Sequence, residues 1–214
     1  MDVAPRQSAI PDRRHRRRQE SHARIRSAAR SLFLERGVDA TTIDEIAAQA
    51  EVSQKTFFNH FATKQVLLRE LARSVVGHFE QLLSQVCKET DAIEARLEGF
   101  FVAVASEVET SRVLTRDMLH QIIRGASGEG LGSDELRRVR AGFRDVLAEG
   151  RLEKPTLGAE AQIEFQTDLV TGAFIGVILQ WLNEPSYPLR ERMRETARFL
   201  GAALAAAPDE HRAV

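Results

Sequence analysis

The chain has 214 residues, 43% of them hydrophobic, so it is large and apolar enough to form a substantial core in one or two domains. Its single cysteine, Cys87, excludes an internal disulfide bond and, with no Cys/His cluster beside it, argues against a structural zinc site. The charged N-terminus lacks the apolar stretch of a secretory signal, and the longest apolar run, 169–182, is too short to span a bilayer. These features predict a cytoplasmic protein.

The charge is unevenly distributed, although the net charge is only −1. Residues 1–64 contain 12 Arg and Lys against 8 Asp and Glu, a balance of +4 that leaves −5 for the remainder. This asymmetry suggests an N-terminal part that meets a polyanion. Residues 1–18 contain two prolines and almost nothing apolar, which predicts a mobile basic arm. Its run RRHRRR is either a solvated tail or a contact to phosphates or a minor groove, and we favour the contact.

The first helix is predicted from about Glu20 to Arg36, where Gly37 supplies the left-handed residue that commonly ends a helix. Its apolar stripe consists of Ile25, Ala28, Ala29, Leu32 and Phe33.

The stretch 41–61, TTIDEIAAQAEVSQKTFFNHF, predicts a helix-turn-helix. Thr42 and Glu45 have the spacing of a capping box, in which each residue satisfies a backbone amide of the other at the start of a helix. Ala47 is small enough to let a second helix cross closely, and Ser53 is a good N-cap for that second helix.

The second helix of this pair is expected to have two different faces. Phe57 and Phe61 lie four residues apart and should turn back toward the first helix. The other face displays the polar and aromatic side chains that an element entering a major groove requires, namely Gln54, Lys55, Phe58 and Asn59. Capping and a polar face are also found in any soluble helical hairpin, so these patterns alone leave a helical protein-interaction module open.

The remainder of the chain predicts helices and no alternating strands, and the fold class is therefore all-α. Lys64, behind Thr63 as N-cap, opens a long helix that reaches about Cys87. The loop 125–132, GASGEGLG, lacks the preceding strand and the GK[ST] ending of a phosphate-binding loop. Further helices are expected at about 92–109, 112–124, 134–149, 159–183 and 189–206.

The last two helices are expected to form a dimer interface as half of a four-helix bundle, because the first of them is apolar around much of its circumference. Gly172 and Gly176 would let another backbone approach closely, while Trp181, Leu200 and Leu204 would supply buried area. The alternative is that these residues belong to an ordinary core.

Residues 20–64 resemble the N-terminal domain of the tetracycline-repressor (TetR) family of transcriptional regulators. The segment ATTIDEIAAQAEVSQKTFFNHFATKQVLL is similar to that family's signature over its whole span. The resemblance implies about nine helices, with a DNA-binding domain at 19–64 and a ligand-binding and dimerisation domain at 65–214. It also implies a homodimeric repressor that releases palindromic operator DNA when a small molecule binds.

The resemblance assigns individual roles to the matching positions. Gln54 and Lys55 match base-reading positions, and Phe58 matches an aromatic one. Two departures occur, because Phe58 and His60 stand where the family usually has tyrosines. A third is Glu51, which replaces a common glycine and would be strained by about 1 kcal/mol if left-handed. Phosphate contacts are matched by Thr42, Thr56, Asn59, His60 and Lys64.

The ligand cannot be identified from the sequence, and the resemblance only suggests which residues enclose it. The six histidines are scattered, with no nucleophile motif and no metal spacing, so we expect neither an enzyme, a metal site nor a cofactor. A regulator that activates transcription remains an alternative to a repressor. The residues expected to line the ligand site, unless they are plain core, are Phe79, Phe101, Met118, Gln121, Phe143 and Phe165.

Overall fold

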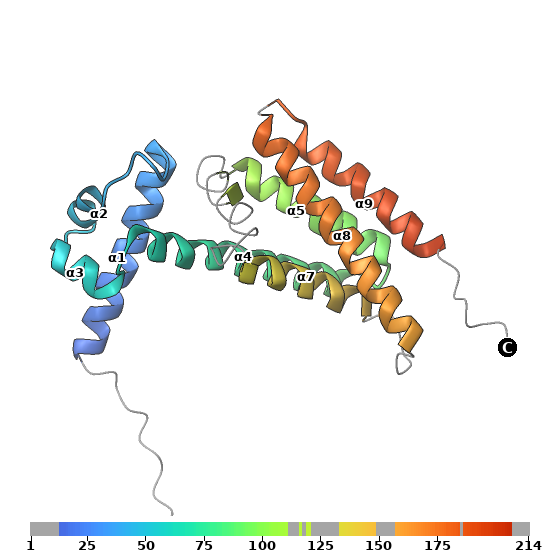
Figure 1. Ribbon diagram of the computed structural model, residues 1–214, viewed down its shortest axis with the longest axis horizontal. Helices are drawn as coiled ribbons and strands as arrows, with labels where there is room; N and C mark the ends of the chain where they lie inside the picture. Colours follow the sequence, from blue (N-terminus) through green and yellow to red (C-terminus); the bar gives the residue numbers. More distant parts are fainter. Residues whose placement is uncertain are drawn as a thin grey trace, which may run out of the picture. The chain divides into compact units, whose positions relative to one another are not determined.

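The computed structural model describes residues 13–110, 116, 119–120, 133–148, 157–184 and 186–206. Within these ranges the chain forms helices and no strand, which confirms the all-α class for the described part (Figure 1). Contacts divide the chain into two compact units, 1–68 and 69–214.

The N-terminal unit is built from three helices and the start of a fourth. They are α1 (Arg13–Arg36), α2 (Ile43–Gln49), α3 (Gln54–His60) and the first residues of α4 (Lys64–Glu89). The predicted stripe of α1 is buried, and so are the residues that α2 and α3 turn toward it. The core of this unit contains Ile25, Ala29, Phe33, Ile46, Ala47, Phe57, Phe61 and Leu67.

Helix α1 begins earlier than its apolar stripe indicates. It starts at Arg13 rather than near Glu20, so the predicted helix start is wrong and the run RRHRRR is helical, while the mobility of the basic arm stays a prediction. Arginine is a good helix former, and Arg16 pairs with Glu20 one turn later at 3.3 Å, which supports an exposed helix without apolar contacts. Residues 1–12 lie outside the described part. At its other end α1 stops before Gly37, which has the predicted left-handed backbone with φ 81°.

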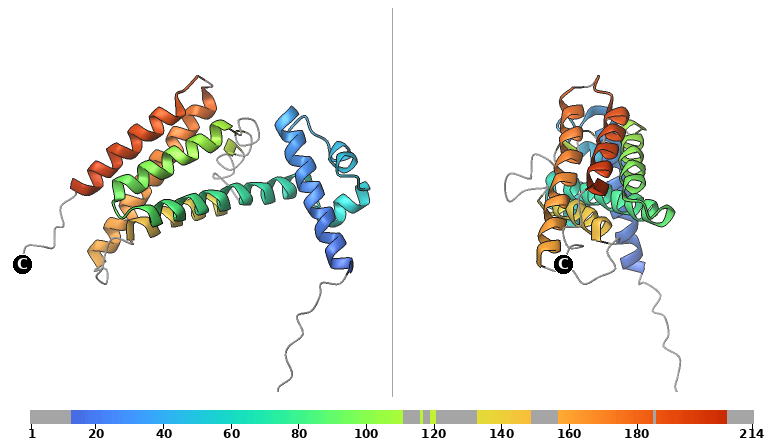
Figure 2. Two further views of the ribbon diagram at one scale, coloured as in Figure 1. Left: turned by 180° about the vertical axis from the view of Figure 1, so that it is seen from behind. Right: turned by 90° about the vertical axis from the view of Figure 1, so that its right-hand side faces the viewer.

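The C-terminal unit packs four further helices with the rest of α4. Figures 1 and 2 show α5 lying along α9, α7 lying along α4, and α8 between α7 and α9. Of the predicted helix at 112–124, only Arg116, Leu119 and His120 are described, all helical, and the loop 125–132 is outside the described residues. The helices are α5 (Ile93–Thr110), α7 (Ser133–Ala148), α8 (Leu157–Asn183) and α9 (Leu189–Ala206).

Four phenylalanines from three helices fill the centre of this unit. Phe100 and Phe101 of α5 meet Phe143 of α7 and Phe174 of α8, with ring centroids 5.2–6.2 Å apart and mostly edge-to-face. This is the preferred geometry for aromatic pairs. The rings therefore form a filled interior that holds α5, α7 and α8 together.

Helices α5 and α9 approach each other closely at Gly201. A Cβ placed there would come within 2.8 Å of the Cα of Glu94, so α9 and α5 nearly touch through their backbones. Any side chain at this position would push the two helices apart.

Helix α8 also contains the longest apolar run of the chain. The stretch Glu160–Asn183 is long and apolar enough to cross a membrane by length and composition. Half of it is buried inside the protein, and a core helix of a soluble protein passes the same test. Packing within the C-terminal unit therefore explains the buried half of the run.

Candidate nucleic-acid interface and effector cavity

The predicted capping box is present at the start of α2. The Thr42 amide donates to Glu45 Oε2 at 2.9 Å, and the Glu45 amide donates to Thr42 Oγ1 at 3.2 Å. The Thr42 amide and then its hydroxyl hold the pKa of the Glu45 carboxyl below its ordinary value. The Thr42 hydroxyl also donates to Glu45 Oε2 at 2.9 Å, so a contact to phosphate would require its proton to change partner.

The turn and the N-cap of α3 also follow the sequence. Ser53 accepts from the Thr56 amide at 3.1 Å, and its hydroxyl lies 2.9 Å from the Thr56 hydroxyl. Glu51 has a positive φ of 53°, so the left-handed residue expected in the turn is there. Its cost is the backbone strain that a glycine would avoid.

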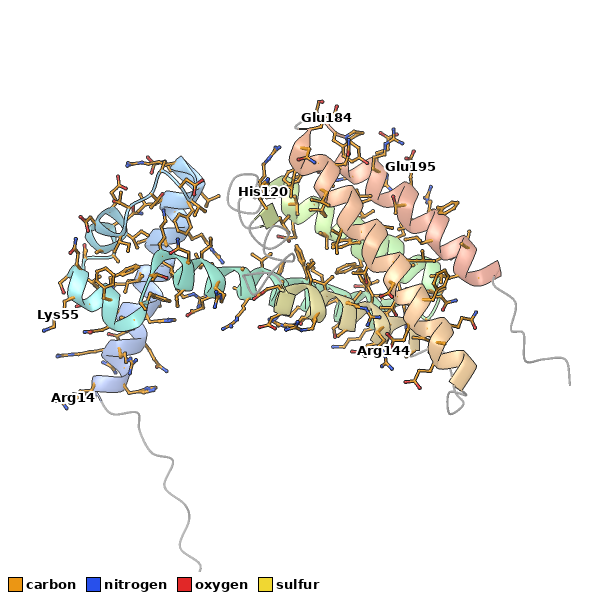
Figure 3. The ribbon with its side chains drawn as sticks, in the orientation of Figure 1. Arg14, Lys55, His120, Arg144, Glu184 and Glu195 are labelled. Carbon is orange, nitrogen blue, oxygen red and sulfur yellow. The ribbon has the colours of Figure 1, made fainter. Side chains whose placement is uncertain are left out.

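Helix α3 exposes one face to solvent and buries the other. Phe57 is fully buried, while its neighbour Phe58 is 49% exposed and touches the Phe57 ring edge-to-face at 5.6 Å. Lys55 extends away from the helix into solvent (Figure 3). Gln54 and Asn59 are exposed as well. The unit therefore presents a donor-rich helical face with one aromatic ring on it.

Gln54 is held by a residue of α2. Its Nε2 donates to Asp44 Oδ1. An ionised carboxylate only accepts hydrogen bonds, so the amide nitrogen must face Asp44 and the amide oxygen must point elsewhere. Asp44 thus fixes the orientation of the Gln54 amide, a role that the sequence did not reveal because the two residues are ten positions apart.

Lys64 makes contacts inside the N-terminal unit. Its ammonium donates to the carbonyl oxygens of Val38 at 2.8 Å and Thr41 at 2.9 Å, and the side chain is half-buried. Lys64 therefore ties the start of α4 to the connection between α1 and α2. The predicted phosphate contact stays a prediction, for which one of its three N–H groups is available.

His60 lies beside a second histidine that sequence reasoning passed over. The rings of His60 and His22 of α1 are 5.6 Å apart and edge-to-face, and His22 stacks on Phe61 at 4.9 Å. Burial, then His22 and then Arg18, lower the pKa of His60 below its ordinary value. No pattern along the chain pairs positions 22 and 60, since only the packing of α1 on α3 brings them together.

The residues expected to line a ligand site are dispersed. Phe101 and Phe143 are buried in the phenylalanine cluster, and Phe79 lines an apolar cavity of only about 30 Å³ with Phe174. Phe165 is 63% exposed and lines neither this cavity nor the larger one described below, and its place in a ligand site stays a prediction. Met118 and Gln121 lie outside the described residues.

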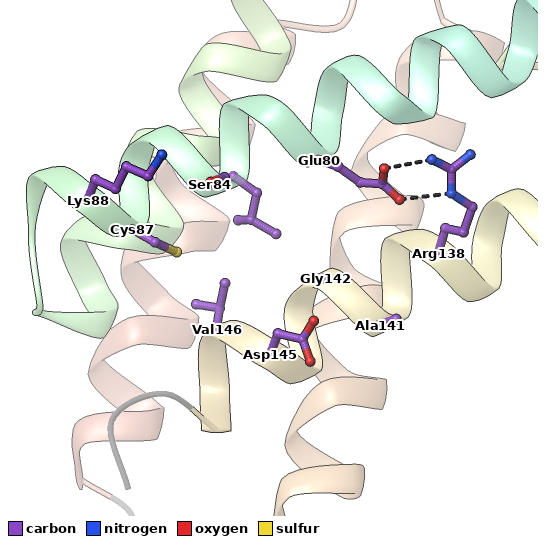
Figure 4. Close-up of a pocket in the computed structure, with 10 residues that line it drawn as sticks. Glu80, Ser84, Cys87, Lys88, Arg138, Ala141, Gly142, Asp145 and Val146 are labelled. Atoms are coloured by element: carbon purple, nitrogen blue, oxygen red, sulfur yellow. Dashed lines mark hydrogen bonds and ion pairs between the residues drawn. The ribbon is translucent and has the colours of Figure 1, made fainter. Parts of the chain in front are cut away.

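A larger cavity lies between α4 and α7, where no lining residue was predicted. It has a volume of about 490 Å³, and Figure 4 shows the bidentate ion pair of Arg138 with Glu80 at one end and Lys88 at the other. Gly142 allows α7 to approach α4 here, since a Cβ would come 3.0 Å from Leu83 Cδ2. The cavity, called the α4–α7 groove below, is lined by Glu80, Leu83, Ser84, Cys87, Lys88, Arg138, Ala141, Gly142, Asp145 and Val146.

The predicted dimer residues separate into two groups. Trp181 is 6% exposed and Leu200 is 9% exposed, and both belong to the core of their own chain, with Leu204 packed against it. Trp181 and Leu200 therefore have little surface left for a partner, while Leu204 is only partly buried, and their role in dimerisation stays a prediction. Gly172 and Gly176 are exposed, and a Cβ at either would meet nothing within 4 Å.

The described ranges contain no candidate metal site. No three His, Cys, Asp or Glu side chains in them are arranged to hold a metal ion.

Comparison with known proteins identifies the N-terminal unit. Residues 25–71 match the family model described as bacterial regulatory proteins, tetR family. The HTH-type transcriptional repressor KstR2 of Mycobacterium tuberculosis (strain CDC 1551 / Oshkosh) is 31% identical over 81 residues, which cover 38% of this chain and 40% of KstR2. The HTH-type transcriptional activator FasR of Mycolicibacterium smegmatis is 30% identical over 101 residues, which cover 45% and 46%. The chain thus spans less than half the length of these curated relatives.

The fold is shared over a longer stretch. The transcriptional regulator FadR from Bacillus subtilis, solved in complex with stearoyl-CoA, matches 85% of this chain and 98% of its own with a TM-score of 0.64. At 19% identity this likeness shows the fold alone. The match over residues 25–71 thus identifies this part of the chain as the N-terminal region of a TetR-family regulator.

Proposed function

We propose that this chain is a cytoplasmic, homodimeric transcriptional repressor that binds a palindromic operator through α2 and α3 and releases it when a small molecule binds the C-terminal unit. The observation that carries the proposal is the outer face of α3. Lys55, Phe58 and Asn59 are exposed there, on a helix whose opposite face is anchored by buried Phe57. A short helix fixed in this way can enter a major groove with its side chains directed at base edges.

In the proposed interface, one set of residues reads bases and another set binds phosphates. Gln54 and Lys55 stand at the front of α3, where the recognition helix of a helix-turn-helix meets bases, and Phe58 offers a ring for a thymine methyl. The basic start of α1 adds a sequence-independent attraction to the backbone. Phosphate contacts are assigned to Thr42, Thr56, Asn59, His60 and Lys64, of which Thr42 and Lys64 must share donors that already have partners within the protein.

Dimerisation is proposed through an exposed stripe on α8. Phe165, Leu169, Gly172, Gly176 and Leu179 are all exposed on this helix. Their spacing alternates between four and three residues, which is the repeat that keeps one seam of a helix facing a partner helix. The exposed glycines would allow a partner backbone to approach. We call this stripe the α8 seam.

The neighbouring helix α9 adds to the case for a partner at this end of the chain. Phe199 of α9 is 75% exposed, and exposed large apolar side chains on adjacent helices mark interaction surfaces. A two-fold pair of α8–α9 units would bury the α8 seam and hold two copies of α3 about 34–36 Å apart, the spacing of successive major grooves on one DNA face.

For the effector we propose the α4–α7 groove. A volume of about 490 Å³ lies within the usual range for small-molecule sites, whereas the apolar cavity near Phe79 is water-sized. The groove combines apolar side chains such as Leu83 and Val146 with charged groups at both ends, Arg138 at one and Lys88 at the other. It would therefore suit an apolar molecule that carries a polar or charged end.

The test is binding to the DNA beside the protein's own gene, since such regulators often control themselves or a divergent neighbour. Fluorescence anisotropy should give tighter binding to one duplex than to a scrambled duplex of equal length, and light scattering should give two chains per complex. Lys55→Ala should reduce the ratio of the two affinities. Equal affinity for every duplex would reject the operator reader, and no binding at all would favour a protein-interaction module.

Activation is the second candidate, because a relative matched over 45% of this chain is described as a transcriptional activator. A reporter gene behind the bound duplex distinguishes the two. Deleting the regulator should raise expression if it represses and lower expression if it activates.

A further inference from the structure

Four residues form a compact group where the first half of α1 packs on the end of α3. His22 stacks on Phe61 at 4.9 Å, and the edge of one imidazole meets the other, with His22 and His60 centroids 5.6 Å apart. Arg18, one turn before His22 on α1, acts on His60 through its charge. We call Arg18, His22, His60 and Phe61 the His22–His60 cluster.

In the free protein, the surroundings of His60 disfavour its protonated form. Partial burial is the main cause of the low pKa of His60, and the charges of His22 and Arg18 lower it further. Both charged groups lie on α1, the element packed against this side of α3. At neutral pH His60 is therefore mostly uncharged in the free protein.

An anion between the two helices would reverse this balance. A phosphodiester brings one negative charge, accepts hydrogen bonds from both imidazoles and from the guanidinium of Arg18, and favours the protonated form of His60. Stacking on Phe61 restrains the His22 ring, so less side-chain freedom is lost when a ligand binds. A cationic group that lowers the pKa of His60 in the free protein also attracts an anion to the same place.

We propose that Arg18, His22 and His60 form a site for one phosphodiester of the DNA backbone, and that the site takes up a proton when the phosphate binds. The proposal rests on the proposed DNA-binding function and adds two residues of α1 to its interface. Because the ligand is backbone phosphate, the proton uptake occurs on every DNA sequence alike.

The sign of the pH dependence follows from the two pKa values of His60. Free protein has the lower value and the phosphate complex the higher one, so affinity increases as pH falls through the interval between them. At pH values above the higher pKa or below the lower pKa, the contribution of this site to affinity does not change with pH. If the two values differ by one unit, affinity differs about tenfold between these limits.

The experiment uses the full chain and a duplex of random sequence, so it does not depend on the operator. Anisotropy at constant ionic strength between pH 8.5 and pH 5.5 should show tighter binding at the lower end, by about tenfold for each unit between the two pKa values. His60→Gln should lose most of the pH dependence, and His22→Gln should show a shallower dependence; each curve is compared with its own value at pH 8.5. His78→Gln is the matched control, because His78 lies in the C-terminal unit, 3.6 Å from Glu107, and should leave the curve unchanged.

A direct measurement guards against variants that disturb the packing on Phe61. Proton NMR of wild-type imidazole signals, assigned with the two variants, should show the pKa of His60 rising when DNA is added. Inorganic phosphate at the same concentration of phosphate groups should leave it unchanged, which assigns the site to the DNA backbone. A rise with inorganic phosphate alone would overturn that assignment.

The failure of this inference is distinguishable from that of the proposed function. A wild-type protein that binds DNA with no pH dependence, or a His60→Gln variant with the wild-type curve, overturns the phosphate site while leaving DNA binding intact. A protein that binds no duplex at any pH overturns both.

Discussion

The ammonium group of Lys64 lies 2.9 Å from the carbonyl oxygen of Thr41 and donates a hydrogen bond to it, although 23 residues separate the two. A second bond, to Val38 at 2.8 Å, makes Lys64 a link between α4 and the connection that leads into α2. A residue predicted from the family resemblance as a phosphate contact therefore also supports the fold of the N-terminal unit.

Lys64→Ala should consequently destabilise the protein and not only weaken DNA binding. Hydrogen bonds from a charged donor are each worth about 1.5–3 kcal/mol, and the mutation would leave two carbonyls without this partner. We expect a loss of roughly 2–3 kcal/mol in urea unfolding, less than the sum for two bonds, because the half-buried site lets water replace part of the interaction. Lys55→Ala is the control, since Lys55 is exposed and should leave the unfolding midpoint unchanged; identical midpoints for both variants would refute the link.

Asp44→Asn should relax the sequence preference of the protein. The asparagine side chain can present either its oxygen or its nitrogen to Gln54, so the Gln54 amide is no longer held in one orientation. Competition binding should show the affinity for non-cognate DNA rising relative to operator DNA, by roughly 1 kcal/mol of lost discrimination. Asp39→Asn removes an equally exposed charge from the same unit and should shift both affinities together.

The dependence on Gln54 can be isolated further. In a Gln54→Ala background, Asp44→Asn should change the affinities for operator and non-cognate DNA by equal factors, because the oriented amide is gone. A remaining loss of discrimination in that background would mean that Asp44 acts by another route.

Gly176→Arg should produce a folded monomer or insoluble protein and abolish tight operator binding. Within the chain nothing lies within 4 Å of a Cβ at this position, and replacing a helical glycine by arginine favours the helix by roughly 0.8–1 kcal/mol. Loss of dimer in light scattering with unchanged circular dichroism would therefore report a blocked interface. A Gly176→Arg dimer with full operator affinity would place the interface elsewhere.

Glu51→Gly should stabilise the N-terminal unit. Glycine adopts a φ of 53° without strain, which recovers about 1–2 kcal/mol, while its greater freedom in the unfolded chain costs about 0.4–1 kcal/mol. The expected net gain in the free energy of unfolding is roughly 0.5–1 kcal/mol. Glu51→Ala also removes the 3.9 Å ion pair with Arg24 but keeps the strain, so it should show no gain.

Acid should weaken the start of α2 through Glu45. Its folded-state pKa is depressed, so the stability it contributes is fully present above the ordinary value and is lost as pH falls through the folded-state value. Thr42→Ala removes the hydroxyl from the capping box, and unfolding curves should therefore show a smaller difference between pH 7 and pH 3 than the wild type. An unchanged difference would show that the hydroxyl does not stabilise the carboxylate.

Most of the correct predictions came from sequence patterns that span only a few residues. The capping box at Thr42, the N-cap at Ser53 and the helix stop at Gly37 each depend on residues within one turn, and each is present. The split between buried Phe57 and exposed Phe58 likewise follows from helical periodicity. Such features can be predicted because their physical cause lies within a few residues along the chain.

Sequence reasoning was least informative where packing between distant segments determines which residues are buried and which are exposed. Periodicity marks Trp181 and Leu200 as apolar, but it cannot distinguish a partner chain from the chain's own core, and both lie in the core. The glycines show the same limit, since close approach within the chain occurs at Gly201 and not at Gly172. Asp44 and His22 were missed for this reason, as their roles depend on how α1, α2 and α3 pack.

The filled phenylalanine cluster bears on how strongly an effector can bind. A molecule lodged among Phe101, Phe143 and Phe174 must displace a ring, and vacating that much core costs about 3–5 kcal/mol. The dissociation constant would be weakened by roughly two to four orders of magnitude. The α4–α7 groove demands no such rearrangement, so among effectors of similar size, nanomolar binders should occupy the groove and only weak ones the centre.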